Sequence, residues 1–355
     1  MSISLEEASK LSNDILLKGV IETIIKDSPI LQELPFIQIV GNSLTYNREK
    51  TLPTVGWHAP VSGEWTQSEP AFEQVKATLC VLGGDADVDN FLKSTRSDIQ
   101  DLEAAVIEQK AKAVRLEFEN AFINGDGTSN QPEGLYTLLK GTAWQASHAY
   151  SLGNIVVPTA GLENGFKYEC TTAGTSGASA PTWPTQEGAT VNDNTVTWTC
   201  LHGHHLGSGA NGGALSFTNL DALIDLVRGG KPDILLMSRR SRRKLQGLIR
   251  SSGSILETVP GRFGEHVQLY DGIPVAISDW VKDNYTVGTS TNCSAVFAFQ
   301  LGEGALCGLS SPEMIQVERL GSLETKDSAR TRVKWYVSLA LFSCVKSAML
   351  TGVTD

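Results

Sequence analysis

The chain has 355 residues, too many for one typical domain, and we expect two or three folding units. Hydrophobic residues make up 41% and charged residues 19%, with 34 glycines, which favours a globular, loop-rich protein and excludes a disordered one. The formal net charge of −10 argues against a simple nucleic-acid binder, because non-specific affinity for DNA comes from neutralising phosphates. A protein that merely surrounds nucleic acid is compatible with this charge.

Residues 1–44 are predicted to form an N-terminal arm. Ser4 and Glu7 have the spacing of a capping box ahead of apolar residues at helical intervals, and Ser28-Pro29 ends the pattern. Such a helix packs either on its own domain or on a neighbouring subunit, and the sequence does not separate the two. No secretory signal is recognised at the start, and six scattered cysteines favour a reducing, cytoplasmic compartment.

Residues 45–80 predict a long two-stranded excursion with a turn-rich tip. An isolated two-stranded ribbon is marginally stable in water, so one this long needs another surface to lie on. Trp57 and Trp65 are the natural anchors for that contact, being large and rigid, and with Glu69 they are our candidates for an assembly interface. The alternative is that both tryptophans fold back onto the core of their own chain.

A long helix is predicted over residues 98–123. Its apolar residues form two rows on neighbouring faces, so it is covered on more than one side, with Val114, Phe118 and Phe122 in its core. The helix ends in a turn whose residues break helices or accept unusual backbone angles: Gly125, Asp126, Gly127 and, further on, Gly134.

Residues 142–213 read as a small all-β module inserted after this turn. The segment is rich in Gly, Thr, Ser, Ala and Pro, nearly uncharged, and contains short alternating runs. An insertion at a surface loop is expected to project and either to decorate the surface or to bind a glycan. Trp183 and Trp198 are candidates for stacking on a sugar, but we favour them as the module's core.

The module contains no strong candidate for a metal site or a disulfide. Cys200, His202, His204 and His205 lack the paired spacing that lets one backbone turn present two zinc ligands, so no metal site is predicted. Cys170 and Cys200 lie at the ends of two predicted strands and are candidates for a disulfide that forms only under oxidising conditions.

Downstream, residues 214–310 alternate between helical and strand patterns. The final segment predicts long strands, in which five apolar residues share one face: Val333, Trp335, Val337, Leu339 and Leu341. The most apolar stretch, residues 336–350, is too short to span a membrane and contains Lys346.

Arg239, Arg240, Arg242 and Arg243 belong to the one dense basic run, on a predicted helix. They are expected to contact acidic residues of another subunit or nucleic acid, and the plain alternative is a solvated helix face. We favour the contact between subunits, because identical subunits that assemble must offset their repeated like charge.

No catalytic constellation is found. Asp85, Asp87 and Asp89 alternate like part of a calcium loop, but Arg96 occupies the position of the bidentate acid that would follow. The sequence contains neither a phosphate-binding loop of the Gly-Lys-Ser/Thr type nor a Gly-x-Ser-x-Gly nucleophile elbow. We therefore expect neither an enzyme nor a cofactor.

The order of these segments resembles the major capsid proteins of tailed bacteriophages with the Hong Kong 97-type fold. The resemblance rests on Leu52-Pro53 and Trp57 in the excursion, Glu69-Pro70-Ala71-Phe72, the long helix, and Asn124-Gly125-Asp126-Gly127 followed by Gln131-Pro132-Glu133-Gly134. It implies an α+β fold with an N-arm (1–44), an extended loop (45–80), a peripheral domain (81–141 and 311–355) built on a spine helix, and an axial domain (214–310). The β module (142–213) would be an addition.

The resemblance also implies a function. The protein would be a major capsid protein that self-assembles into pentamers and hexamers of an icosahedral head in the host cytoplasm. Its partners would be further copies of itself, double-stranded DNA enclosed without sequence specificity, and scaffold, portal and decoration proteins. An encapsulin-type nanocompartment and a glycan-binding surface protein acting through residues 142–213 are the alternatives.

Overall fold

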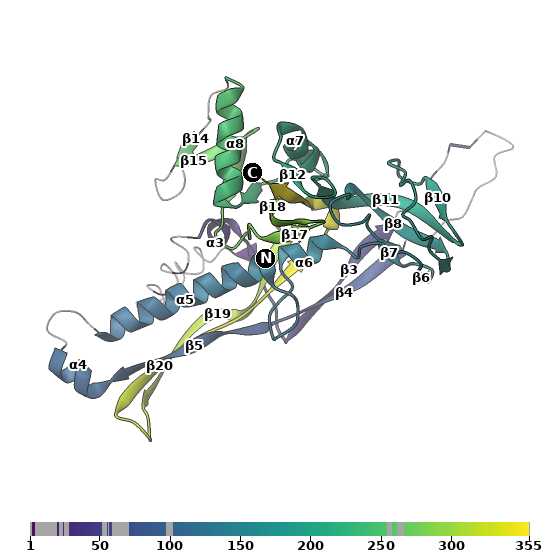
Figure 1. The fold of residues 1–355 in the computed structure, drawn as a ribbon. Coiled ribbons are helices and arrows are strands. Elements are labelled where there is room, and N and C mark those ends of the chain that lie inside the picture. The colour runs from purple at the N-terminus through teal and green to yellow at the C-terminus, as the bar shows by residue number, and fades with distance from the viewer. Residues whose placement is uncertain are drawn as a thin grey trace.

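The computed structural model describes residues 2–3, 20, 24, 28–51, 55, 57–58, 71–96, 102–253, 258–260 and 266–354. Figure 1 shows an elongated molecule, with a long extension at one end, a central body, and a β-rich region at the other end. Within the described residues, sheets of five and twelve strands organise the fold, and two smaller two-stranded pairs lie beside them. This arrangement confirms the predicted α+β class.

The five-stranded sheet is the frame of the extension. Its strands, in spatial order, are β1 (Ser2–Ile3), β2 (Phe36–Gln38), β19 (Leu306–Ser322), β20 (Ser328–Leu341) and β5 (Cys80–Asp89), and α4 (Asn90–Arg96) follows β5. The shared apolar face predicted for the final segment is confirmed, because all five residues are buried: Val333, Trp335, Val337, Leu339 and Leu341. The alternation of side chains along a strand thus gives this sheet one face for a core.

Helix α5 (Leu102–Asn124) covers that buried face (Figure 1). Val114, Phe118 and Phe122 are at most 3% exposed, and the ring centroids of Phe118 and Trp335 lie 4.8 Å apart. The predicted first residues of this helix, 98–101, lie outside the described residues. The long helix is therefore held by aromatic packing against the strands of the C-terminal hairpin.

The N-terminal arm is described only in part. Val20 and Ile24 are buried in the same core as α5, and most of the predicted helix before Ser28 lies outside the described residues. Helix α3 (Pro29–Glu33) begins where the Ser28 side-chain oxygen accepts a hydrogen bond from the Leu31 amide at 3.2 Å, an N-cap reinforced by proline in the first turn.

The turn after α5 requires glycine for reasons of space. A Cβ atom on Gly125 would lie 2.1 Å from the Pro132 carbonyl oxygen, and one on Gly134 would lie 2.6 Å from that of Ala121. The Gly134 amide donates to the Gly125 carbonyl oxygen at 2.9 Å, which brings the two ends of the turn together. The chain then enters α6 (Leu135–Lys140).

Asp126 and Gly127 shape the exposed part of this turn. The Asp126 carboxylate accepts hydrogen bonds from the Thr128 hydroxyl at 2.6 Å and the Thr128 amide at 2.8 Å, and these bonds lower the pKa of Asp126. Gly127 has a φ of 72°, in the left-handed region where glycine is favoured.

The twelve-stranded sheet forms the body and continues into the β-rich end. Its main path, in spatial order, is β14 (Thr258–Pro260), β15 (His266–Tyr270), β16 (Ile273–Ile277), β13 (Ile234–Met237), β18 (Ser290–Phe299), β21 (Ser347–Thr354), β11 (Val196–Gly207), β8 (Asn164–Thr172) and β7 (Ile155–Val156). β10 (Thr190–Asp193) pairs with β11, β12 (Gly213–Ala214) with β21, and β17 (Tyr285–Val287) with β18, while the short 3₁₀ helix η1 (Cys344–Lys346) precedes β21.

Both faces of the body sheet are covered. In β13, Ile234 and Leu236 point into the core that contains α3, α5 and α6, whereas Leu235 and Met237 point into a second core. Helices α7 (Phe217–Asp225) and α8 (Arg239–Ser251) cover this second face. A strand buried on both sides has a continuous run of apolar residues, and Ile234–Met237 is such a run.

The β-rich end has a core of its own, centred on Tyr168 and Trp198. Trp198 is fully buried and Trp183 packs against it half-buried, so the interpretation of these residues as core is confirmed. Strand β6 (Ala149–Tyr150) pairs with β9 (Gly174–Thr175) at the edge of this region. The sheet itself is continuous with the body, because β11 pairs antiparallel with β8 and then parallel with β21.

One buried carboxylate links several groups in the core of this module through hydrogen bonds. Asp193 is 4% exposed, and its Oδ2 accepts the indole N–H groups of Trp144 at 2.8 Å and Trp198 at 3.1 Å. Its Oδ1 accepts the Gly177 amide at 2.8 Å. A buried acid is tolerated only when its oxygens are satisfied, so Asp193 and the two tryptophans form one unit.

Candidate assembly surfaces

The first candidate surface is the ribbon formed by β3 (Ser43–Thr51) and β4 (Ala71–Thr78), which pair only with each other among the described strands. Beyond β3, the side chains of Val55 and Trp57 are fully exposed in the part of the chain that the structure describes. Trp57 therefore does not fold back onto its own core. Trp65 and Glu69 lie outside the described residues.

The root of the ribbon is attached to the body. The Tyr46 hydroxyl donates to the Leu341 carbonyl oxygen at 3.2 Å, and the Tyr46 and Phe342 ring centroids are 4.6 Å apart. The Arg48 guanidinium contacts the Cys344 sulfur at 3.0 Å. These contacts fix where the ribbon leaves the body.

A groove of about 820 Å³ lies between the ribbon root and the turn after α5. Its walls include Lys76 and Cys80 on one side and residues 127–133 on the other. The turn after α5 thus lies beside the ribbon. Neither the pattern of the turn nor that of the ribbon indicates this proximity in the sequence.

The second candidate surface is helix α8, which carries the basic run. The Ser238 hydroxyl oxygen caps the helix by accepting the Ser241 amide at 3.2 Å. Ser241, Leu245 and Ile249 are buried, as helical periodicity requires for a helix lying on a sheet. The arginines and Lys244 occupy the remaining circumference.

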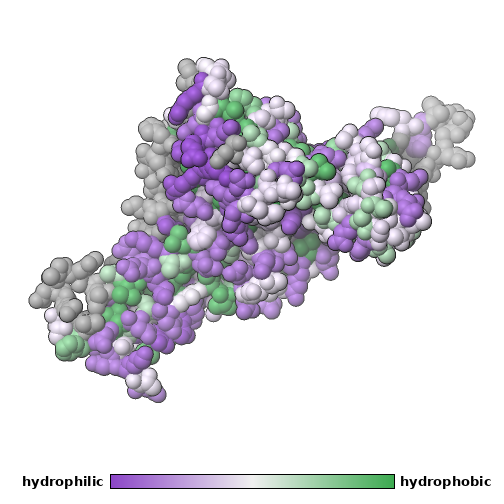
Figure 2. Space-filling view, viewed as in Figure 1, coloured by the Kyte–Doolittle hydropathy of each residue, from purple (hydrophilic) through white to green (hydrophobic). Residues whose placement is uncertain are grey.

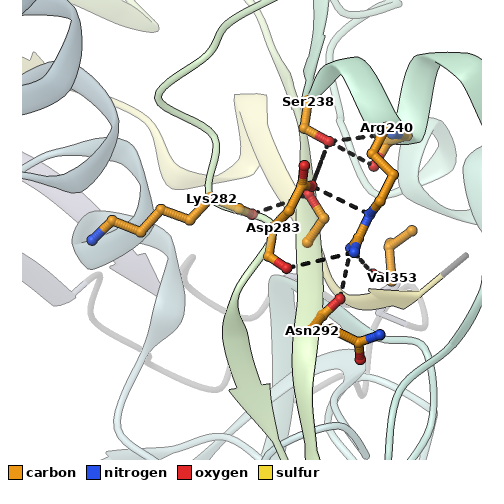
Figure 3. A network of polar contacts seen from close by, with 8 residues as sticks. Ser238, Arg240, Lys282, Asp283, Asn292 and Val353 are labelled. Atoms are coloured by element: carbon orange, nitrogen blue, oxygen red, sulfur yellow. Dashed lines mark hydrogen bonds and ion pairs between the residues drawn. The ribbon is translucent and has the colours of Figure 1, made fainter.

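Two of the four arginines are held by their own chain, and Figure 3 shows the contacts of one of them, Arg240. Arg240 donates to the Asn292 carbonyl oxygen at 2.7 Å and to that of Val353 at 3.3 Å, and its Nε lies 3.4 Å from an Asp283 carboxylate oxygen. The Arg239 guanidinium makes a two-point contact with Asp279, and this bond lowers the pKa of Asp279. Arg239 and Arg240 thus have intramolecular partners, and their expected contact with a neighbouring subunit stays a prediction.

Arg242, Arg243 and Lys244 differ from these two, since no described residue forms an ion pair with them. Arg243 is exposed, and with Lys244, Gly247, Leu248 and Ser251 it lines a groove of about 470 Å³. On the face of the molecule shown in Figure 2, the most strongly hydrophilic area lies over α8. The basic run is therefore divided into a structural part and an outward part.

Two histidines of the β module, His202 and His205, contact the body of the protein. His205 is 3% exposed, with Nδ1 2.9 Å from the Lys140 carbonyl oxygen and Nε2 2.9 Å from the Thr351 hydroxyl, and burial lowers the pKa of His205 to about 4. His202 Nε2 lies 3.1 Å from the Leu226 carbonyl oxygen. These contacts join the module to the body.

The disulfide considered for Cys170 and Cys200 is not formed in this structure, where both thiols are free and buried. The strand register pairs Cys170 with Trp198 and Cys200 with Tyr168, so the two cysteines are diagonal neighbours. Diagonal positions lie about 7–8 Å apart, farther than a disulfide normally spans.

The alternating aspartates of β5 have an internal role that the sequence did not indicate. Arg332 contacts Asp85 at 2.5 and 2.9 Å, and Arg330 contacts Asp87 twice at 2.6 Å. The hydrogen bond from Arg332 lowers the pKa of Asp85. The period of two that suggested a calcium loop instead places these acids opposite arginines on the neighbouring strand.

Comparison with known proteins identifies the fold. The SrpI encapsulin of Synechococcus elongatus matches with a TM-score of 0.58 at 15% identity, over 99% of this chain and 96% of that chain. The capsid of a native GTA particle matches with a TM-score of 0.52 at 15% identity over 94% and 91%, and a chain from Microbacterium phage Oxtober96 with 0.54 at 13% over 92% and 91%. The fold is thus the predicted Hong Kong 97-type capsid fold.

No curated protein matches the chain. Among the described residues, no helix has the length and apolar character needed to cross a membrane. A sequence model described as the phage capsid family matches residues 12–300, which is most of the chain. The chain therefore belongs to the phage capsid family, and it is a subunit of a homo-oligomeric capsid shell.

Proposed function

We propose that this chain is the major capsid protein of a tailed-phage head, assembling into pentamers and hexamers of an icosahedral shell that encloses double-stranded DNA. The observation that carries the proposal is the family match over residues 12–300. The division into arm, extended loop, peripheral domain, inserted module and axial domain, with the boundaries given from the sequence, belongs to the same proposal.

The ribbon supports this function because its root is fixed to the body and an exposed tryptophan follows its first strand. Tyr46 and Arg48 hold its root to the body, whereas Trp57 is fully exposed. A large aromatic side chain left in water beyond a narrow ribbon suits a contact with the next subunit. Repeating a modest contact around a closed shell makes the whole assembly stable through multivalency.

The charge of the chain defines its relation to DNA. A formal net charge of −10 does not favour tight, non-specific attraction to phosphates, which suits a shell that surrounds its DNA. We propose that the enclosed DNA is not recognised by sequence. We propose assembly in the host cytoplasm with scaffold and portal proteins. The β module is the proposed site for a decoration protein or a surface glycan.

Expression of the chain followed by cryo-electron microscopy tests the proposal. We expect icosahedral shells, and we expect native particles to contain DNA that resists added nuclease. A chain that stays monomeric at high concentration, both alone and with its assembly partners, would contradict the proposal.

An encapsulin-type compartment is the second candidate, because the SrpI encapsulin covers 99% of this chain at a TM-score of 0.58. The same experiment separates the two functions. Native shells that hold a protein cargo and no nuclease-resistant DNA would favour the compartment.

A further inference from the structure

Helix α8 carries two cations, the exposed Arg243 and the half-buried Lys244, that no described residue neutralises. Arg239 and Arg240 are bound by Asp279 and Asp283, while Arg243 and Lys244 have no ion-pair partner among the described residues. Because the chain carries a net charge of −10, carboxylates are abundant on a second copy. Unpaired cations on a ring-forming subunit thus have an available complement in the next subunit.

Gly247 gives an independent indication of a close neighbour. It lies in the middle of α8, where glycine destabilises a helix relative to alanine. Its φ is not positive, and no described atom lies within 4 Å of the position that its Cβ would occupy. Nothing in the described chain therefore requires glycine at this position. A partner backbone that came close to the groove beside Arg243 and Lys244 would require it, because a larger side chain would then collide with the partner.

An acidic edge lies on the other helix of the same layer. Asp221 and Asp225 are exposed, and their spacing of four residues places both on one side of α7. Asp221 accepts a hydrogen bond from the Tyr270 hydroxyl at 2.7 Å, and no described residue forms an ion pair with Asp225. α7 and α8 cover the same face of the body sheet and lie on the same side of the central body (Figure 1).

In a ring with rotational symmetry, the basic face of α8 and the acidic edge of α7 can meet. In a ring, each subunit contacts the next through two different patches at the same level along the axis. We propose that the outward face of α8, formed by Arg243, Lys244 and Gly247, binds the α7 edge formed by Asp221 and Asp225 of the adjacent copy in a capsomer ring. This inference rests on the proposed pentamers and hexamers, and it adds which surfaces meet.

Protein is favoured over nucleic acid as the occupant of this groove. Leu248 and Gly247 line it together with the two cations, so part of the wall is apolar or bare backbone. A polypeptide covers such a wall, whereas a phosphodiester chain would use only the cations.

Charge reversal tests the pairing. Arg243→Glu and Asp225→Lys, each alone, are expected to raise the subunit concentration needed for shell assembly at least about tenfold, and the double variant is expected to restore assembly towards wild type. Arg250→Glu makes the same charge change on the same helix outside the groove and is the matched control. Equal losses for Arg243→Glu and Arg250→Glu, or no rescue in the double variant, would overturn the pairing.

Gly247→Ala separates assembly from folding. The variant is expected to raise the melting temperature of unassembled subunits while lowering the yield of shells, and an unchanged yield would overturn a close approach at this position.

Two further outcomes are distinguishable. If the Arg243→Glu, Lys244→Glu variant forms empty shells normally but packages less DNA, judged by absorbance at the nucleic-acid and protein maxima, the face binds nucleic acid and the inference fails. Absence of shells from the wild-type chain would instead overturn the proposed function itself.

Discussion

Replacing Asp193 with asparagine should destabilise the β module strongly although the side chain keeps its shape. In the native protein one carboxylate oxygen accepts two indole N–H groups, from Trp144 and Trp198, and the other accepts the Gly177 amide. Asparagine has one oxygen only, so if that oxygen keeps Gly177, an NH₂ group faces two indole donors.

The magnitude follows from the two donors left without an acceptor. Each buried donor that loses its partner costs about 1–3 kcal/mol, so we expect a loss of about 2–6 kcal/mol in the free energy of unfolding. Trp198 is fully buried and Asp193 is 4% exposed, so water does not replace the lost acceptor. The cost is of the same order as the whole stability of many domains.

Urea unfolding of unassembled subunits, followed by tryptophan fluorescence, measures the loss. Asp225→Asn is the matched control, because that carboxylate is exposed and has no described ion pair, and we expect it to stay within about 0.5 kcal/mol of wild type. A similarly small effect for Asp193→Asn would refute the reasoning that one carboxylate holds the module core together.

Four further outcomes are expected. Trp57→Ala should leave the melting temperature of unassembled subunits unchanged and block shell formation seen by electron microscopy, since its side chain is fully exposed; a lower melting temperature would place it in its own core. Phe118→Asp should abolish soluble folded protein, because it puts a charge at a site 1% exposed against Trp335, whereas Phe118→Ala should cost about 3–5 kcal/mol by denaturant titration. Gly125→Ala should destabilise the subunit measurably in the same titration, because its Cβ would lie 2.1 Å from a carbonyl oxygen, while Gly247→Ala serves as the permissive control. The folded-state pKa of His205, about 4, lies below the unfolded value of about 6.5. The stability that neutral His205 permits is therefore fully present above pH 6.5 and is lost as the pH falls towards 4. His205→Gln should weaken the pH dependence of the free energy of unfolding across this window, and an unchanged pH dependence would count against it.

Much of the fold can be predicted from local sequence patterns. The period of two around Trp335 predicts the buried face of the C-terminal hairpin, and the apolar run of β13 predicts a strand covered on both sides. The order of the segments, and not any single motif, identified the Hong Kong 97-type fold. The buried face of the hairpin and the buried strand are local features, so a single sequence is enough to find them.

The candidate surfaces needed tertiary information. Nothing in the basic run distinguishes Arg240 from Arg243, because the groups that bind Arg240 come from Asp283, Asn292 and Val353, far along the chain. The role of Asp193 was hidden for the same reason: its partner Trp144 is 49 residues away. The sequence also predicted the glycine turn as a helix stop, whereas the structure shows that Gly125 and Gly134 are required by a close approach of backbone to backbone.

The continuity of β11 between the two regions also determines how force travels through the subunit. This strand pairs with β8 in the module and then runs parallel to β21 in the body, with His205, Leu206 and Gly207 in register with Met349, Leu350 and Thr351. A pull on the module along the strand would load those hydrogen bonds together, in shear, instead of opening them one after another. A load attached to the module would therefore be passed to the body sheet, one face of which packs in the same core as α5.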